Sequence, residues 1–249
     1  MSPYPPASRF VVPLFAALFA ATAIRAQTIE TLQPPSIGGH ALAFDTLRST
    51  AVLFGEGQTW EFDGAAWNHR AAPVAPSPRW GAGMVFDGAR GRILLFGGQS
   101  TVGPQVFGDT WEYDGAAWTQ ITVVTTPPPR RGAGMVFDAQ RGRTVLFGGG
   151  EPLSASWLQD TWEYDGTNWS QVTTAHSPSP RERMAIAAGA GTTLLFGGYA
   201  GFAGGMDDTW TYDGIDWTLR SPALTPLRRY DSAMVFDLQR GRFVMVGGQ

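Results

Sequence analysis

One motif recurs along this chain at a nearly constant interval, and it limits the possible fold more than any other feature. Its copies at residues 109–115, 160–166 and 208–214 read Asp-Thr-Trp, a variable residue and Tyr-Asp-Gly, and a degenerate copy spans residues 58–64. The first Trp stands at positions 60, 111, 162 and 210, and a second Trp stands at 67, 118, 169 and 217. Both series have intervals of 51, 51 and 48 residues. Such a period indicates a repeat architecture in which each unit packs on its neighbours.

Each unit predicts four short strands. Upstream of the motif lie two apolar runs, for example residues 83–86 and 93–96, and continuous apolar runs are typical of strands covered on both faces. The motif itself alternates in polarity, and the residues after the second Trp, such as 118–123, are rich in β-branched side chains. Asp114-Gly115 supplies the positive φ of a tight hairpin, and no segment shows a helical period. We therefore predict an all-β fold, a β-propeller of four-stranded antiparallel blades.

Three features of the repeat resemble Kelch repeats: the Gly-Gly that closes the second strand, the Tyr-Asp-Gly with its following Trp, and the Pro-Arg that opens the next unit. The likeness is greatest to the bacterial exported form related to the central domain of galactose oxidase. The resemblance implies a Kelch-type β-propeller over residues 27–249, with about 4.5 radially arranged blades. We expect these blades at residues 36–72, 79–124, 130–174 and 181–221, with a half blade at 228–249.

The closure of the ring has two interpretations, because the fifth unit stops at Gln249, directly after its Gly-Gly. Residues 27–35 resemble the fourth-strand segment 119–129 and would supply an outer strand to the half blade. Alternatively the chain is incomplete, since Kelch rings usually have more blades. Its last blade would then expose strand edges, which favour self-association. We favour the incomplete chain.

Residues 1–26 have the pattern of a secretory signal peptide. Arg9 precedes an apolar run over residues 10–21, which is shorter than a membrane-spanning helix. Cleavage after Ala23 or after Ala26 would fit this pattern, and an uncleaved anchor is the alternative. We therefore expect a secreted, periplasmic or cell-surface protein with no membrane span once the signal is removed.

Composition excludes several kinds of site. The chain has no Cys, which excludes disulfides, thiolate metal sites and cysteine nucleophiles, and its 3 His residues leave little material for a zinc or copper centre. Its 18 basic and 21 acidic side chains nearly cancel, which argues against a nucleic-acid partner. The copper-radical chemistry of galactose oxidase requires His ligands and a Tyr–Cys cross-link, so the resemblance does not carry that activity here. We predict no catalytic residue, no metal and no cofactor.

We interpret the residues that recur in every unit as structural. Eight of the 10 Trp residues occupy the two repeated positions, where they are expected to pack between neighbouring sheets. The Asp before each Thr-Trp is expected to cap its strand, because calcium needs about six to eight oxygen ligands. The Asp three residues before each Arg-Gly-Arg should accept turn N–H groups and pair with the adjacent arginine; these are Asp87, Asp138 and Asp237. The arginines that stand five residues before the Met of the first strand, after Pro or a second Arg, should donate to carbonyls of the loops between blades; these are Arg79, Arg130 and Arg229.

Strand parity predicts where a ligand would bind. In an antiparallel four-stranded blade, the loop between strands two and three lies on the same face as the connection to the next blade. These are the long segments of each unit, at residues 99–108, 150–159 and 199–207, and binding residues concentrate on such loops. The long-loop face offers aromatic side chains on which sugar rings or peptide side chains can stack: Phe107, Trp157, Tyr199 and Phe202. The alternative is that these rings fold back over the blade edge.

The fourth unit departs from the others. Aligned on its Met184, it places Arg183, preceded by Glu182, where the second and third units have Gly in the innermost strand. Innermost strands line the central channel of a propeller, so both charges would lie at the channel mouth. His40, which replaces an Ala of the other units, is a similar irregularity. A mutual ion pair of Glu182 and Arg183 without a ligand is the alternative.

These observations favour an exported, non-catalytic propeller that binds a protein or a glycan through its long-loop face. The alternative is a hydrolase or lyase with a site over the central channel that uses Arg183 and Glu182. Against it, a glycosidase needs two carboxylates about 5 Å or 6.5–9.5 Å apart, and nearly all Asp residues here are repeated turn residues. No Gly-x-Ser-x-Gly, phosphate loop or His-Glu-x-x-His motif is present.

Overall fold

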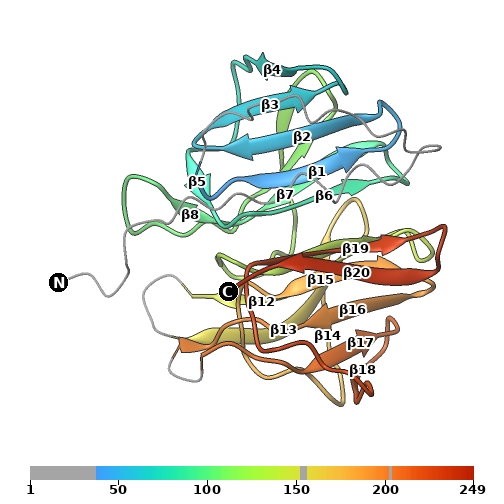
Figure 1. The fold of residues 1–249 in the computed structure, drawn as a ribbon. Helices are drawn as coiled ribbons and strands as arrows, with labels where there is room; N and C mark the ends of the chain where they lie inside the picture. The colour runs from blue at the N-terminus through green and yellow to red at the C-terminus, as the bar shows by residue number, and fades with distance from the viewer. Residues whose placement is uncertain (1–37, 152–155, 202–203) are drawn as a thin grey trace.

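The computed structural model describes residues 38–151, 156–201 and 204–249, and the elements in these ranges are all β-strands (Figure 1). Three predictions fall outside the described residues: the signal peptide at 1–26, the closing strand at 27–35 and the candidate contact Phe202. The described part of the chain therefore corresponds to the five repeat units.

Four sheets have four antiparallel strands each. The first contains β1 (Ala41–Asp45), β2 (Thr50–Gly55), β3 (Gln58–Phe62) and β4 (Trp67–Arg70). The second contains β6 (Gly83–Asp87), β7 (Arg92–Phe96), β9 (Thr110–Tyr113) and β10 (Trp118–Ile121). The third contains β11 (Gly134–Asp138), β12 (Arg143–Gly150), β13 (Trp157–Tyr164) and β14 (Trp169–Val172). The fourth contains β15 (Ala185–Gly189), β16 (Thr192–Phe196), β17 (Thr209–Tyr212) and β18 (Trp217–Arg220). Two further sheets have two strands each: β19 (Ser232–Asp237) with β20 (Arg242–Gly247), and β5 (Arg79–Trp80) with β8 (Gln99–Ser100).

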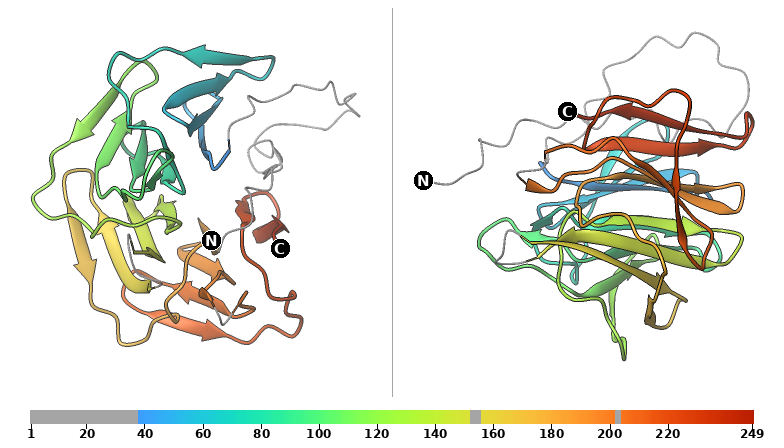
Figure 2. Two further views of the ribbon diagram at one scale, coloured as in Figure 1. Left: turned by 90° about the vertical axis from the view of Figure 1, so that its left-hand side faces the viewer. Right: turned by 90° about the horizontal axis from the view of Figure 1, so that it is seen from below.

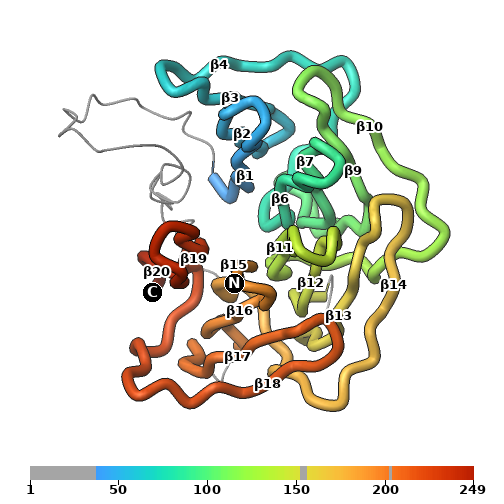
Figure 3. The backbone as a smooth tube through the Cα atoms, turned by 90° about the vertical axis from the view of Figure 1, so that its right-hand side faces the viewer, coloured from blue at the N-terminus to red at the C-terminus, as the bar shows by residue number. Residues whose placement is uncertain are grey.

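The sheets are arranged radially around one axis (Figures 2 and 3). The first strand of each sheet lies nearest this axis, and contacts run from β1 to β6, from β6 to β11, from β11 to β15 and from β15 to β19. The predicted all-β class and the propeller of four-stranded blades are confirmed. The four complete blades are followed by the strand pair β19–β20 as a partial fifth blade.

The inner hairpins form through the turn chemistry that the sequence predicts. The Asp87 carboxylate accepts the N–H groups of Ala89 and Arg90 at 3.1 Å each, and it pairs with the Arg90 guanidinium at 2.6 Å. The same contacts recur at the third and fifth units, where the carboxylates of Asp138 and Asp237 each pair with the arginine three residues later at 2.8 Å. The structural interpretation of these aspartates is confirmed.

The second Trp of each motif joins neighbouring blades. Trp118, Trp169 and Trp217 are buried, and each indole N–H donates to the hydroxyl of a Thr in the preceding blade at 2.8, 3.0 and 2.9 Å. Each indole also packs against a Phe of that blade, with ring centroids 5.1–5.4 Å apart. The predicted packing between sheets is confirmed for these three residues, and burial of each indole removes about 200 Å² from water.

The fourth blade shows that one predicted alignment is wrong. Ala185 pairs with Phe196 as Gly83 pairs with Phe96 in the second blade. The equivalent of Gly83 is therefore Ala185, and the alignment on Met184 that assigned this position to Arg183 is shifted by two residues. The cause is a shorter inner hairpin: only residues 190–191 join β15 to β16, whereas residues 88–91 join β6 to β7. Arg183 thus precedes the innermost strand instead of lying in it.

Candidate functional site

An arginine and an aspartate hold together the start of each blade from the second to the fourth. Arg79, Arg130 and Arg181 each form a bidentate pair with the Asp before Thr-Trp in their own blade, with shortest N–O distances of 2.5, 2.6 and 2.5 Å. The aspartates are Asp109, Asp160 and Asp208. We call these three pairs the clamps. The strand-capping role predicted for the aspartates is wrong, because an arginine and the indole N–H two residues later take up their carboxylate oxygens.

The clamps are buried, structural ion pairs. The three arginine side chains are at most 1% exposed, and Arg79 also donates to the carbonyls of Ser77 and Gly97 at 3.0 Å each, as predicted. Burial acts to raise the pKa of Asp109, but the hydrogen bonds and charge of Arg79 outweigh it and hold that pKa below its ordinary value. Arg229 in the fifth unit keeps the equivalent carbonyl bonds, to Leu227 and Gly247 at 3.0 and 3.2 Å.

Two residues after the repeated arginine of the second to fifth units, the backbone forms a chain of hydrogen bonds around one end of the propeller axis. The N–H groups of Gly81, Gly132, Arg183 and Asp231 each donate to the carbonyl of the equivalent residue in the preceding blade, at 3.3, 2.8, 2.7 and 2.9 Å. All of these residues, and Gly39 where the chain of bonds begins, have φ between 56° and 65°. Glycine adopts this left-handed conformation freely and Asp tolerates it, whereas Arg adopts it at a cost of about 1–2 kcal/mol. Arg183 is therefore held in a strained conformation at this position.

The residue directly before the left-handed residue differs in every unit. It is Gly38, Trp80, Arg131, Glu182 and Tyr230 in chain order. From the second unit on, it pairs with the residue after the Gly-Gly of its own unit, which is Gln99, Gly150, Tyr199 and Gln249 in turn. We call these positions, together with the left-handed residues, the mouth. The mouth thus combines one backbone geometry with a different side chain in each blade.

Side chains of the third to fifth blades meet at the mouth in one cluster. The Trp157 and Tyr199 rings are 6.2 Å apart with planes at 80°, and the Tyr199 and Tyr230 rings are 5.1 Å apart. Arg183 lies over the Tyr230 ring, 4.9 Å from its centroid, and forms a bidentate pair with Asp231. Glu182 accepts a hydrogen bond from the Trp157 side chain. We call these six residues the mouth cluster: Trp157, Glu182, Arg183, Tyr199, Tyr230 and Asp231.

Glu182 is a buried acid of the mouth cluster. It is 5% exposed, and among the described residues it forms one ion pair, a 3.6 Å contact with the Arg131 Nε, which is longer than a hydrogen bond. Burial raises the pKa of Glu182, and the opposing effects of Arg131 and the Trp157 hydrogen bond do not cancel it. The predicted mutual pair of Glu182 and Arg183 is replaced by two separate pairs, Glu182 with Arg131 and Arg183 with Asp231.

The structure brings some predicted contacts together and leaves others apart. Trp157, Tyr199, Glu182 and Arg183 meet in the mouth cluster. Phe107 instead lies over the guanidinium of Arg79, 3.9 Å from ring centroid to Cζ, where it covers a clamp. His40 lies directly before β1 in the first blade, outside the mouth cluster.

Sequence reasoning did not single out Arg131, Tyr230 or Asp231. The signal that marks them is positional, because they follow the repeated arginine of their unit by one or two residues. Their variation among units was visible in the sequence. It became informative only when the correct register of the fourth blade showed which residues are equivalent.

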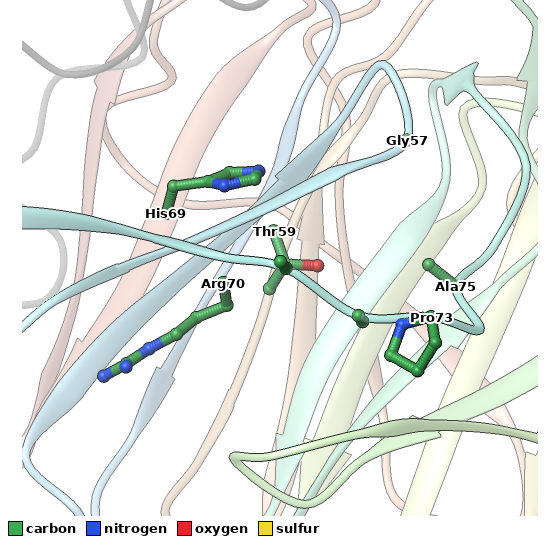
Figure 4. Close-up of a pocket in the computed structure, with 8 residues that line it drawn as sticks. Gly57, Thr59, His69, Arg70, Pro73 and Ala75 are labelled. Atoms are coloured by element: carbon green, nitrogen blue, oxygen red, sulfur yellow. The ribbon is translucent and has the colours of Figure 1, made fainter.

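A cavity of about 490 Å³ lies in the first blade, away from the mouth cluster (Figure 4). Residues of β3, of β4 and of the following linker line it, among them Thr59, His69, Arg70 and Pro73. The side chains of His69 and Arg70 leave β4 on opposite sides, and the His69 ring packs against Trp60 at 5.0 Å. The cavity therefore lacks converging charged groups.

The described residues contain neither a cluster of metal ligands nor a helix that could span a membrane. No group of three or more His, Cys, Asp or Glu residues in residues 38–151, 156–201 and 204–249 is arranged to hold a metal ion. Within those same ranges, no helix has the length and apolar character needed to cross a membrane.

Comparisons with known proteins agree with this architecture. The sequence model of the KLHDC2/KLHL20/DRC7 Kelch-repeats domain matches residues 56–248. The Dynein alpha chain, flagellar outer arm, of Chlamydomonas reinhardtii is 29% identical over 138 residues, which are 51% of this chain and 3% of the dynein chain. Dynein regulatory complex subunit 7 of the same organism is 30% identical over 114 residues, which are 43% of this chain and 10% of that subunit. This chain thus spans only a small part of those relatives.

Among solved structures, that of YjhT superposes with a TM-score of 0.65 at 19% identity, over 84% of this chain and 72% of that chain. At this level of identity the similarity concerns the fold alone. It supports a β-propeller with the blade arrangement described above.

Proposed function

Because the chain belongs to the KLHDC2/KLHL20/DRC7 Kelch-repeat family, we propose that it is a non-catalytic binding propeller, exported from the cell, whose mouth takes a protein or glycan ligand. Kelch propellers are typical scaffolds for protein interactions, and a rigid scaffold with variable residues at one edge is the usual arrangement of a binding site. The proposal also includes glycan ligands, because sugar rings can stack on the aromatic rings of the mouth cluster.

One observation carries this proposal. At the mouth, equivalent backbone positions hold a different side chain in each blade, and two of them hold charged residues in a left-handed conformation that glycine occupies in the other blades. Strain of this kind costs about 1–3 kcal/mol per residue and is concentrated at functional sites. A purely structural role would favour the glycine that the other blades already use.

The test is a comparison on peptide and glycan arrays. We expect the wild type to retain a ligand that the double variant Trp157→Ala, Tyr199→Ala loses, with an unchanged thermal midpoint. The control is His69→Ala at the cavity of the first blade, which should retain the ligand. Equal retention by wild type and double variant would show that the ligand does not bind at the mouth cluster.

A second candidate function, a hydrolase or lyase at the mouth, is favoured by one observation. The pKa of Glu182 is raised by burial, which suits a carboxyl group that must hold a proton near neutral pH. Turnover of a glycan substrate by the wild type and its loss in Glu182→Gln would favour this function over simple binding.

Export is supported by the sequence pattern of residues 1–26, and the relationship to bacterial exported Kelch proteins and to galactose oxidase belongs to the same proposal. The measurement is N-terminal sequencing of the protein recovered outside the cytoplasm. We expect a mature chain that begins at Ile24 or Gln27. Recovery of the full-length chain in the cytoplasm would contradict export.

A further inference from the structure

The partial fifth blade has an open sheet edge. In the described residues β20 pairs with β19 alone, whereas the second strand of each complete blade also pairs with a third strand. No residue of β20 is buried, whereas most residues of the equivalent strands β2, β7, β12 and β16 are buried. Such an edge presents unpaired backbone N–H and C=O groups to which an extended segment can add. The third-strand position beside β20 is therefore a candidate docking surface.

The repeated arginine of this unit has no carboxylate partner among the described residues. Arg229 donates to the carbonyls of Leu227 and Gly247, the same kind of bonds that the clamp arginines make in their own units. Each clamp arginine also binds the Asp that precedes the Thr-Trp of its blade's third strand. The clamp arginines are buried, whereas Arg229 is half-buried. A carboxylate in the third-strand position beside β20 would complete a fourth clamp.

Apolar groups next to this position are also uncovered. Leu194 of the fourth blade is half-buried, whereas its equivalents in the first three blades are at most 1% exposed and share a core cluster with the first Trp of the next blade; these are Val52, Leu94 and Val145. Pro226 of the following linker is exposed, whereas the equivalent prolines of the preceding linkers are buried; these are Pro76, Pro127 and Pro178. Among the described residues, the fifth unit thus lacks the Trp that covers the preceding blade elsewhere.

The charges along this edge favour an acidic segment. Besides Arg229, Arg228 and Arg242 form no ion pair with a described residue. The two aspartates of the fifth unit, Asp231 and Asp237, are each paired with an arginine already. The edge therefore carries positive charge that the described residues do not compensate, and complementary charge favours a negatively charged partner.

We infer that the fifth unit binds an extended segment of a partner protein, which pairs antiparallel to β20 as its third strand. An acidic residue of this segment forms a bidentate pair with Arg229, and a Trp two positions later covers Leu194. The spacing is that of the clamps, in which the indole N–H two residues after the Asp donates to its carboxylate at 2.7 Å. This surface shares no residue with the mouth cluster, so the inference goes beyond the proposed function.

A partner segment suits this position better than the segments that the chain itself offers. Residues 27–35 resemble a fourth strand, and they contain Glu30 but no aromatic side chain. The Asp-Thr-Trp segments of a second copy do not fit either, because their aspartates are held in the clamps of that copy. The occupant is therefore an acidic segment with a Trp that belongs to another protein.

The test is a calorimetric titration of the full chain with a peptide that has the sequence of residues 158–164. These residues lie in β13, the third strand of the third blade, and include Asp160 and Trp162. We expect the peptide to bind. Replacing its Asp by Asn or its Trp by Ala should each weaken binding about tenfold or more. The peptide N-methylated at alternate residues along the edge that faces β20 should not bind, because it cannot pair with the strand.

Two variants locate the binding surface. Arg229→Gln should weaken binding of the Asp peptide about tenfold and change binding of the Asn peptide little, because the two changes remove the same ion pair. Arg228→Gln is the matched control, since it removes the adjacent positive charge, and it should bind the Asp peptide nearly as the wild type does. Hydrogen exchange of the complex should show new protection of the β20 amides.

The remaining outcomes would overturn the inference. These are failure of the peptide to bind the wild type, equal binding of the Asp and Asn peptides, and binding that survives Arg229→Gln. Binding that appears only in Glu30→Gln would assign the position to residues 27–35, and a dimer in sedimentation that Arg229→Gln abolishes would assign it to a second copy. The double variant Trp157→Ala, Tyr199→Ala should bind the peptide as the wild type does, so this inference and the proposed function fail separately.

Discussion

Arg130 and Arg131 are adjacent in the chain and have opposite roles in the molecule. Arg130 is fully buried, and it pairs with Asp160 and donates to the carbonyls of Pro128 and Gly148. Arg131 is 12% exposed, stacks on Trp80 and reaches Glu182 only at 3.6 Å. The residue that recurs in each blade maintains the scaffold, whereas its neighbour is replaced from blade to blade. In a repeat protein, one step along the chain can therefore separate a residue that every blade needs from one that varies between blades.

The largest expected effect contrasts these two arginines directly. Arg130→Ala leaves the Asp160 carboxylate without its cation in a mostly buried position, which should lower the free energy of unfolding by about 3–5 kcal/mol. Arg131→Ala should lower it by less, because the 3.6 Å contact with Glu182 is longer than a hydrogen bond and Glu182, whose pKa burial already raises, can take up a proton once its cation is lost. Urea unfolding of both variants checks the contrast. If both variants lost a similar free energy of unfolding, Arg131 at the mouth would stabilise the fold as much as Arg130 in its clamp.

The second largest effect expected is a loss of stability at low pH, through protonation of the clamp aspartates. Asp109, Asp160 and Asp208 have a pKa below the ordinary value of 3.8 because their arginines outweigh the effect of burial. A carboxyl whose folded-state pKa is lowered contributes stability that is present above its unfolded pKa and is lost as pH falls through the folded pKa. We expect the thermal unfolding midpoint of the wild type to decrease as the pH is lowered below about 4. The midpoint of Asp160→Asn should decrease less steeply over the same pH range, because that variant has one titrating clamp fewer. Midpoints that are constant through this range would contradict the role of the clamps.

A smaller effect on the free energy of unfolding should distinguish Trp169, whose indole packs between two blades, from Trp67 at the equivalent position of the first blade. Trp169→Phe removes the hydrogen bond to Thr110 and part of a fully buried ring, which should cost about 1–3 kcal/mol of unfolding free energy. The indole N–H of Trp67 is buried without a partner in the described structure, so Trp67→Phe should cost much less. Thermal unfolding of the two variants measures this difference. A greater loss in Trp67→Phe would show that the first blade depends on its indole in another way.

The smallest expected effect concerns strain at the mouth. Arg183→Gly should raise the free energy of unfolding by up to about 1 kcal/mol, because glycine adopts the left-handed conformation freely and the lost pair with Asp231 is partly exposed. The reverse control is Gly132→Ala. The alanine would have to adopt the φ of 61° of this glycine, and its Cβ would lie 3.2 Å from the Glu182 carboxylate. That variant should be destabilised by about 1 kcal/mol or more. Destabilisation of both variants would mean that the Arg183 side chain has a structural role.

The candidate site was only partly predictable. Trp157, Tyr199, Glu182 and Arg183 stood out because they interrupt a regular repeat, and the structure brings them into one cluster. Phe107 also interrupts the repeat, but its ring covers the guanidinium of Arg79 because a buried cation attracts an aromatic face. A non-repeating residue is thus a candidate for binding only, and its contacts decide whether it serves the scaffold.

The sequence alone determined the architecture of this protein. The period of Trp, Gly and Asp residues specifies four strands per unit, the turns between them and the indoles between blades, because each of these depends on local geometry or on nearest-neighbour packing. Tertiary structure decided three other features. These are the register of the inner hairpin in the fourth blade, the pairing of the clamp arginines with their aspartates and the contact of Tyr230 with Arg183. These contacts join residues 27 to 48 positions apart, or follow from a hairpin that is two residues shorter, and strand pairing sets them instead of local sequence preference.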